Sequence, residues 1–372
     1  MNKPLKIIQS FVFTILFILS LFWILNNLAV KVEVEERENF SYTECSDKYE
    51  KTIDDILNYG LDDILELDKV YKLSDSDIIA PLPNPDYYFE LPASESGVII
   101  NEKAKKILNG QKLFFNTEIQ TLNGQPVKFY LDKTIFAVTW KQYINGSIYT
   151  LSEIKIADAS QLRRYLAGGE FGSPYQYVTS DMAKTVNAVV ATSGDFYGFR
   201  NIGVIVYMNK LMRASGEYLD TCFIDENGDM SFIKRGEILS FEDAEHEPLV
   251  KAARFSICFG PVLVENYENV APPHYALGEV KDRYARSALV QMDDLHYMIV
   301  VASGEKFNLH VPTLMEFAHA IHSMGAKHAY ALDGGQTAVL VMNNQVINRV
   351  VYNAQRKISD VVYFATALPS GG

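Results

Sequence analysis

The sequence predicts an α+β fold, in which a mixed β-sheet core packs with a few helices and follows one N-terminal transmembrane helix. Three observations support this prediction. Residues 7–30 form an uncharged apolar run, strand-like segments outnumber helical ones in the rest of the chain, and hairpins coexist there with helical crossovers. We expect three parts: a cytoplasmic tip with the anchor at 1–32, a stalk at 33–95, and a folded domain at 96–372.

The anchor is expected to be an uncleaved single-pass helix. The run from Ile7 to Val30 contains no charge and is long enough to cross a hydrocarbon core of about 30 Å. Lys3 and Lys6 precede it, and the segment after Lys31 is mostly acidic. The positive-inside rule therefore places the N-terminus in the cytoplasm and the main domain outside the cell membrane. A cleaved signal peptide is the alternative, although its apolar core is normally shorter.

The stalk combines a helical segment with a proline-rich one. From Tyr49 to Leu65, apolar residues recur at helical spacing with acidic residues between them, which predicts an acidic helix. The segment "APLPNPDYYFELP", from Ala80 to Pro92, contains four prolines and is interpreted as a linker or an extended brace. We place the domain boundary near Ser96.

Strands and helices then follow in mixed order. "VKFYL" and "TIFAVTW" are rich in β-branched and aromatic residues and predict strands. "DASQLRRYLAGG" predicts a helix with Asp158 as N-cap and Gln161 at N3 that ends at Gly168. "TSDMAKTVNAVVATSGDFYG" predicts a helix that leads into an apolar strand at residues 188–192, and "HYMIVVASG" predicts another strand.

The clearest helix lies in "VPTLMEFAHAIHSMGA". Pro312 suits its first turn, Gly325 ends it, and one apolar stripe comprises Leu314, Phe317, Ala318, Ile321 and Met324. "KHAYAL" then predicts a strand, and "TAVLVMNNQVINRVV" predicts a hairpin that turns at two adjacent asparagines, 343 and 344.

Composition limits the function classes. The chain has 372 residues, a net charge of −12 and an apolar fraction of 48%, so it is expected to fold and to avoid nucleic acid as a partner. Cys45, Cys222 and Cys258 form no CxxC pair, and a bridge between the last two stays open. We find no P-loop, dinucleotide fingerprint or paired metal ligands, and therefore expect neither a metal nor a cofactor.

Two strand ends deliver a carboxylate to a glycine-containing loop. Asp195 follows Gly194 after one apolar strand, and Asp333 precedes Gly334 after another. Glycine lets a backbone approach a ligand closely, and an unpaired buried carboxylate is costly, so each aspartate needs a partner, a ligand or water. The alternative is that both begin ordinary turns.

Arginines near strand ends provide the complementary charge. Arg283 and Arg286 precede one strand, and Arg356 precedes the last strand. Arginine can bind phosphate through two parallel hydrogen bonds. The alternative for any single arginine is a solvated surface charge.

Taken in order, these segments resemble the phosphodiester glycosidase family. "VVATSGDFYG" is similar to the family's "AINGDYYG" strand, "FGPVLVENYE" to its "FGPGLVENG" segment, and "RSALVQMDDLHYMIVVASG" to its "RTAIGIIDDLHYVFVVSDG" segment. The stretch from Leu314 to Asn348 resembles a helix followed by "NLDGGGSSTMYFNGQVVN", and "QRKISDVVYF" resembles "ERSVSDIVYI". The similarity extends from about Thr134 to Ala365.

The resemblance implies hydrolysis of a sugar-1-phosphodiester between the anomeric carbon and the phosphate oxygen. It implies Asp195 and Asp333 as catalytic carboxylates and leaves open which is the acid and which the nucleophile. Carried over by position, the substrate-binding residues are Tyr197, Arg286, Glu305, Gly334, Gly335, Gln336, Thr337 and Arg356. Arginines and backbone N–H groups would hold the phosphate and stabilise the leaving monoester, and a carboxylate would serve the oxocarbenium-like centre or activate water.

Several loop residues depart from the family pattern. Ser193 replaces an asparagine, Gln336 and Thr337 replace a glycine and a serine, and Glu305 replaces an arginine. A glutamate in place of a phosphate-facing arginine can abolish phosphate binding or shift the substrate.

The sequence is therefore consistent with three functions. The first is a membrane-anchored extracytoplasmic hydrolase that cleaves phosphodiester-linked glycans of the cell envelope or of exopolysaccharide. The second is a degenerate relative that binds glycan or envelope polymer without cleaving it. The third is a scaffold subunit of a polysaccharide assembly complex, which uses the anchor and the acidic helix as contacts.

Overall fold

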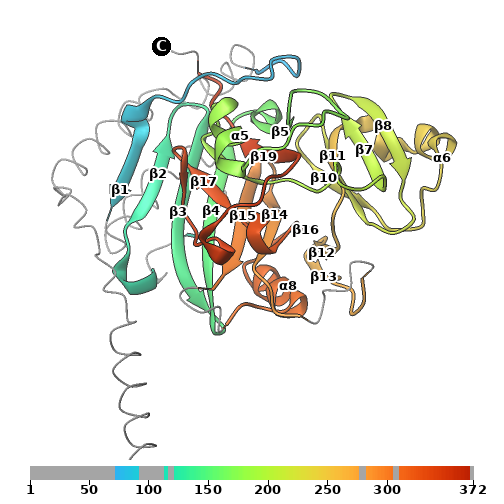
Figure 1. Ribbon diagram of the computed structural model, residues 1–372. Coiled ribbons are helices and arrows are strands. Elements are labelled where there is room, and N and C mark those ends of the chain that lie inside the picture. Colours follow the sequence, from blue (N-terminus) through green and yellow to red (C-terminus); the bar gives the residue numbers. More distant parts are fainter. Residues whose placement is uncertain (1–71, 92–112, 116–120, 276–281, 305–309, 369–372) are drawn as a thin grey trace, which may run out of the picture. The chain divides into compact units, whose positions relative to one another are not determined.

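The computed structural model describes residues 72–91, 113–115, 121–275, 282–304 and 310–368 (Figure 1). The chain divides into two compact units, residues 1–41 and 42–372, and all described residues lie in the second unit. The expected anchor at 7–30 and the expected acidic helix at 49–65 fall outside the described residues. Within the described part of the chain, no helix is both long and apolar enough to span a membrane.

The α+β class is confirmed, and the described residues form one large sheet and three smaller ones. The large sheet has the strand order β1-β2-β3-β4-β15-β14-β16-β12-β13. Its strands are β1 (Tyr88–Leu91), β2 (Val127–Leu131), β3 (Ile135–Ile144), β4 (Ser147–Ile156), β12 (Val262–Glu265), β13 (Glu268–Asn269), β14 (Arg286–Asp293), β15 (His296–Ser303) and β16 (His328–Leu332).

The second sheet has the order β18-β17-β6-β19-β5. Its strands are β5 (Leu162–Leu166), β6 (Val190–Ser193), β17 (Leu340–Met342), β18 (Gln345–Val346) and β19 (Asp360–Phe364). The remaining strands are β7 (Gly203–Tyr207) with β8 (Lys210–Ser215), and β10 (Met230–Ile233), β9 (Thr221–Asp225) and β11 (Ala253–Ile257) in that order. The α-helices are α5 (Thr179–Thr185), α6 (Phe241–His246), α7 (Pro248–Ala252) and α8 (Leu314–Ser323).

Where the sequence predicted a mixed sheet, every pairing between the described strands is antiparallel. A helical crossover commonly joins parallel strands, which is why the sequence predicts a mixed sheet. The chain instead leaves β15 through α8 and returns as β16 beside β14, to which it runs antiparallel.

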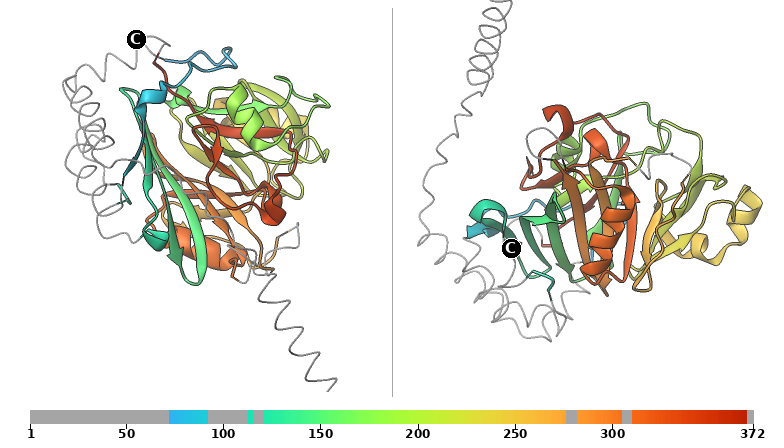
Figure 2. Two further views of the ribbon diagram at one scale, coloured as in Figure 1. Left: turned by 60° about the vertical axis from the view of Figure 1, so that its left-hand side comes forward. Right: turned by 90° about the horizontal axis from the view of Figure 1, so that it is seen from below.

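The two larger sheets pack face to face around a shared core (Figure 2). Strand β15 shows how alternation builds it: Tyr297, Ile299 and Val301 face this core together with Val362 and Phe364 of the five-stranded sheet. The intervening residues of β15 point to the opposite face. Period-two alternation therefore gives the large sheet two buried faces, one toward the second sheet and one toward α8.

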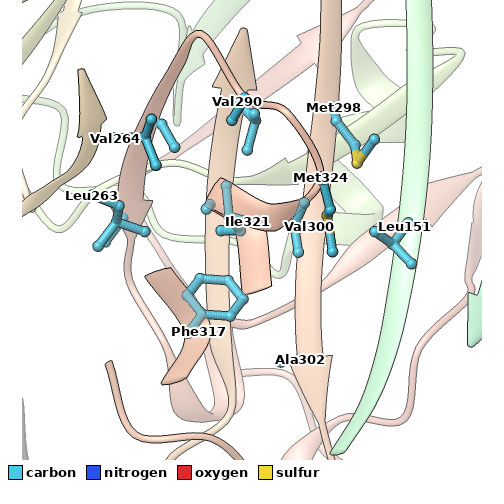
Figure 3. Close-up of a cluster of buried hydrophobic side chains, with 14 of the residues drawn as sticks. Leu151, Leu263, Val264, Val290, Met298, Val300, Ala302, Phe317, Ile321 and Met324 are labelled. Atoms are coloured by element: carbon cyan, nitrogen blue, oxygen red, sulfur yellow. The ribbon is translucent and has the colours of Figure 1, made fainter. Parts of the chain in front are cut away.

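Helix α8 covers the other face of the large sheet. Phe317, Ile321 and Met324 lie against Val300 and its neighbours on β14 and β15 (Figure 3). The apolar stripe predicted from the sequence is thus confirmed as a buried face. The helix begins at Leu314 after a capping box formed by Thr313 and Glu316, so Pro312 precedes the cap instead of lying in the first turn.

The helix predicted from Asp158 to Gly168 is wrong beyond its first turn. The capping box of Asp158 and Gln161 is present, but it starts only the 3-10 turn η3 (Ala159–Gln161). The chain then continues as strand β5, which pairs with β19. A local capping signal cannot show that the following residues gain a ladder of hydrogen bonds from a strand almost 200 positions later in the sequence.

Residues 72–91 pack on the domain, as the brace alternative for the proline-rich segment proposed. Strand β1 pairs with β2 at the edge of the large sheet, and Ala80 is buried. Arg163 Nη2 donates hydrogen bonds to the carbonyl oxygens of Ser74 at 3.1 Å and Asp77 at 2.6 Å. Residues before position 96 therefore contribute contacts to the folded domain.

Two further sequence predictions concern a turn and the cysteines. The hairpin of β17 and β18 turns at Asn343 and Asn344, whose φ angles are 50° and 59°, as the sequence predicted. Cys222 and Cys258 are buried and unbridged, and Cys45 lies outside the described residues.

We predict that a chain beginning at residue 72 unfolds at a higher temperature than one beginning at residue 96. The shorter chain loses β1, the buried Ala80 and the carbonyl partners of Arg163, so its midpoint should fall by about 5–10 °C. Circular dichroism during heating measures the difference. Equal midpoints would support a domain boundary near Ser96 and contradict a stabilising role for residues 72–91.

Candidate functional site

A pocket of about 480 Å³ opens where the end of β16 meets the start of β14. Six of the catalytic and substrate-binding residues that the family resemblance implies line it: Arg286, Asp333, Gly334, Gly335, Gln336 and Arg356. Aromatic and aliphatic side chains, among them Phe259, Tyr275 and Leu314, line other parts of the wall. The pocket therefore combines charged groups with apolar surface, as small-molecule sites commonly do.

The loop after β16 is held tightly to the segment that leads into β14. Gly335 N–H donates a 2.8 Å hydrogen bond to the carbonyl oxygen of Ala285. A Cβ atom on Gly334 would lie 2.5 Å from that same oxygen, so only glycine fits there without a shift of the backbone. Thr337 does not line the pocket, but its hydroxyl donates a 2.7 Å hydrogen bond to the carbonyl oxygen of Gly334 and supports the loop from behind.

Asp333 is the acidic residue among the described residues that line this pocket. Its side chain is largely buried, and its Oδ1 accepts a 2.9 Å hydrogen bond from Gly334 N–H. Its Oδ2 forms an ion pair with Arg356, whose side chain is 51% exposed. Burial raises the pKa of the Asp333 carboxyl above its ordinary value, while the Arg356 charge opposes that rise. Because about half of the Arg356 side chain is exposed, an anionic ligand can reach it from the solvent and compete with Asp333 for its charge.

Two arginines lie on the other side of the loop. Arg286 is half-buried, donates a 2.8 Å hydrogen bond to the carbonyl oxygen of Asp282, and lies 5.7 Å from the ring centre of Tyr284. Arg283 pairs with Glu316 at 2.9 Å and donates to the carbonyl oxygen of Val311 at 3.0 Å. Arg283 thus fastens the start of α8 to the pocket edge, whereas Arg286 is the side chain better placed to bind an anion.

Asp195 does not line the pocket, contrary to the expectation that it shares one site with Asp333. Its carboxylate is fully buried, and it accepts hydrogen bonds from Tyr197 N–H at 2.8 Å and Cys258 N–H at 2.7 Å. Its Oδ2 lies 2.9 Å from Arg164 Nη2. Because Cys258 directly precedes the pocket-lining Phe259, Asp195 supports the pocket wall from behind.

Asp360 is the third member of this buried network. Arg164 Nε donates a 2.7 Å hydrogen bond to Asp360 Oδ2, and Asp195 N–H donates to Asp360 Oδ1 at 3.0 Å. A Cβ atom on Gly194 would overlap Asp360 Oδ2, so the glycine before Asp195 leaves room for this carboxylate. Burial raises the pKa of Asp360 to about 8, Arg164 opposes the rise and Asp195 adds to it. Two carboxyl groups thus share one buried guanidinium, and this environment favours the protonated form of Asp360.

The remaining selected residues lie elsewhere. Tyr197 is buried, its ring stacks on Phe171 with centres 5.4 Å apart, and it does not line the pocket. Ser193 is buried on β6. Glu305 falls outside the described residues.

Arg164 and Asp360 carry no motif that identifies them as site residues in the sequence. Arg164 lies in a segment for which the local pattern predicts a helix, and Asp360 begins the last strand. A charged residue at a buried position needs a partner, so an arginine within a strand-like "LRRYL" was the available signal. The identity of its two partners depends on strand pairing that the sequence does not reveal.

Residues 186–365 match the family model of the phosphodiester glycosidases, and this match confirms the resemblance inferred from the sequence. The matched residues include every site residue selected from the sequence, and the match supports a glycosidase-type hydrolase. No curated protein matches the chain significantly.

The fold is similar to that of the catalytic domain of zebrafish N-acetylglucosamine-1-phosphodiester α-N-acetylglucosaminidase, a structure described as auto-inhibited by its pro-peptide. The TM-score is 0.52 with 17% identity, over 79% of this chain and 99% of that one, which is evidence for a shared fold. A hypothetical protein from Synechocystis matches with a TM-score of 0.45 and 13% identity, over 67% of this chain and 64% of that one.

We predict that Asp360→Asn loses its destabilising effect as the pH rises. In the unfolded chain an aspartate has a pKa of about 3.9. Because the folded value is about 8, folding of the wild type takes up a proton between these limits, and its stability falls as the pH rises through them. The variant lacks this dependence. Urea unfolding at pH 5 and at pH 8 measures the stability gap between the two proteins, which should narrow at pH 8; an equal gap would contradict the protonated state of Asp360.

Proposed function

We propose that the protein is a hydrolase that cleaves sugar-1-phosphodiesters. The observation that carries this proposal is the position of Asp333 in a pocket that also contains Arg286 and Arg356. A carboxylate repels a phosphate that binds beside it. The two guanidinium groups provide the positive charge that offsets this repulsion. The match of residues 186–365 to the phosphodiester glycosidases supports this substrate class.

The pocket favours a reaction with a single carboxylate. Ordinary glycosidases use two carboxyl groups, one of which protonates the leaving oxygen. Here Asp333 is the acid among the described lining residues. A phosphate monoester already leaves as a stable anion, so Arg286 and Arg356 can assist its departure through charge without a proton donor. Asp333 then acts at the anomeric carbon, as nucleophile or as the base that activates water.

Binding of the phosphate also releases the carboxylate for reaction. In the free protein, Asp333 is paired with Arg356. A phosphate that takes over Arg356 leaves Asp333 with the hydrogen bond from Gly334 N–H and exposes Oδ2 toward the pocket. The Arg356 charge thus favours the ionised form of Asp333 in the absence of substrate, against the effect of burial.

Location outside the cell membrane is part of the proposal. It rests on the uncharged run from Ile7 to Val30 and on the charges around it. A hydrolase held there would meet phosphodiester-linked glycans of the envelope or exopolysaccharide.

The second candidate is a glycan-binding protein of the same fold that does not cleave its ligand. The observations that favour it are Gln336 in the pocket lining and Glu305 in the sequence, where the family has a glycine and an arginine. Release of phosphomonoester from a panel of sugar-1-phosphodiesters separates the two functions. No release from any member of the panel, together with retained binding, would favour the second candidate.

We predict that Asp333→Asn folds normally and loses activity on sugar-1-phosphodiesters by at least about 10²-fold, because the amide keeps the shape of the side chain but not its charge. Asp195→Asn is the matched control. It removes a partner from the buried network around Arg164, so it should reduce the free energy of unfolding by about 3 kcal/mol. Activity assays and urea unfolding of both variants measure these effects. Full activity in Asp333→Asn, or an unchanged stability in Asp195→Asn, would contradict the two assigned roles.

We further predict that Arg356→Gln shifts the acidic limb of the pH–activity profile to higher pH. The Arg356 charge favours the ionised form of Asp333, so its removal raises the pKa of that carboxyl further. Activity that requires ionised Asp333 should then appear only at higher pH, with a lower maximum because a phosphate contact is lost. The profile of kcat/KM between pH 4 and pH 9 tests this, and an unmoved acidic limb would count against Asp333 as the ionising group.

A further inference from the structure

The loop that carries Asp333 lies between two flanking segments of the pocket wall. On one side, Gly335 N–H donates to the carbonyl oxygen of Ala285 at 2.8 Å. On the other side, Gln336 Nε2 donates to the carbonyl oxygen of Ala354 at 3.1 Å, and Arg356 N–H donates to the carbonyl oxygen of Gln336 at 3.4 Å. Through these hydrogen bonds the loop contacts residues 284–287 at one position and residues 351–356 at the next.

Each flanking segment provides one arginine and one exposed tyrosine to the same pocket. Arg286 is accompanied by Tyr284, whose side chain is 41% exposed, and Arg356 by Tyr352, which is 84% exposed. All four residues line the pocket. The exposed part of each tyrosine offers a flat apolar surface to a ligand.

The paired arrangement has a chemical consequence. An anion bound by both Arg286 and Arg356 would lie in the pocket that Tyr284 and Tyr352 also line. If each tyrosine lies beside one ester position, an inorganic phosphate touches neither ring, a monoester reaches one ring and a diester reaches both.

We infer that Tyr284 and Tyr352 are the specificity residues that select a phosphodiester over a monoester, because each packs against one of the two ester substituents. The inference rests on the proposed function in that the bound anion is a phosphate ester, but it concerns binding and not cleavage. Hydrolysis leaves the sugar and the monoester as separate molecules, each with one aromatic contact. The products therefore bind more weakly than the substrate and can leave.

The test measures binding of inorganic phosphate, phenyl phosphate and diphenyl phosphate to the full-length protein by calorimetry. The phenyl esters carry apolar rings of similar area, so the test does not depend on the identity of the sugar. We expect affinity to increase about tenfold with each added ring, which corresponds to about 1.4 kcal/mol per step.

Tyr352→Ala should weaken diphenyl phosphate about tenfold and leave inorganic phosphate within a factor of two. Tyr352→Phe should restore the affinity, because it retains the ring. Tyr267→Ala is the matched control: Tyr267 is 55% exposed and has a φ of 65°, close to the 57° of Tyr352, but it does not line the pocket. Tyr284→Ala should likewise reduce the gain in affinity from phenyl phosphate to diphenyl phosphate.

The inference is overturned if Tyr352→Ala weakens inorganic phosphate as much as the diester, if it weakens neither, or if the control has the same effect. It is also overturned if phosphate and both esters bind equally or do not bind. A tyrosine-dependent preference for diesters, together with no release of phosphomonoester from the panel of sugar-1-phosphodiesters, would support the inference and refute the hydrolase. Hydrolysis of that panel without a tyrosine-dependent preference in binding would do the reverse.

Discussion

The buried network of Arg164, Asp195 and Asp360 is the interaction on which the pocket depends. Arg164 lies on β5, Asp360 begins β19, and Asp195 follows β6, so one guanidinium connects three strands of the five-stranded sheet. Arg164 also donates to the carbonyl oxygen of Ser256 on β11, and Asp195 accepts from Cys258 N–H. The network thereby fixes the segment that becomes the pocket wall. Such a cluster is costly to bury and very costly to leave incomplete, which makes it a strong constraint on geometry.

Two similar sequence patterns have separate roles because their glycines act differently. Gly194 precedes Asp195 and leaves space for the carboxylate of Asp360, so Asp195 turns inward to the network. Gly334 follows Asp333 and lets the loop press against the carbonyl oxygen of Ala285, so Asp333 remains at the pocket surface. The first aspartate positions the wall, and the second meets the ligand in the proposed reaction.

Elements with strong local patterns could be predicted from the sequence. The stripe of α8 and the turn at Asn343 and Asn344 depend on neighbouring residues, and both are confirmed. The segment after Asp158 could not be predicted locally, because its strand conformation depends on pairing with β19. For the same reason, the sequence grouped Asp195 with Asp333 and Arg356, although among these three only Asp333 and Arg356 line the pocket. Tyr284 and Tyr352 carry no motif, and only the folded chain brings them to the same pocket.

The central claim is that a phosphate binds between Arg286 and Arg356 with its sugar carbon beside Asp333. A crystal structure of the Asp333→Asn protein with a sugar-1-phosphodiester tests it most directly, because the ligand would remain intact. The account predicts phosphate oxygens within hydrogen-bond distance of both guanidinium groups and the anomeric carbon about 3–3.5 Å from the substituted side chain at position 333, the separation of reacting atoms in a near-attack geometry. A phosphate bound elsewhere, or an anomeric carbon directed away from position 333, would contradict it.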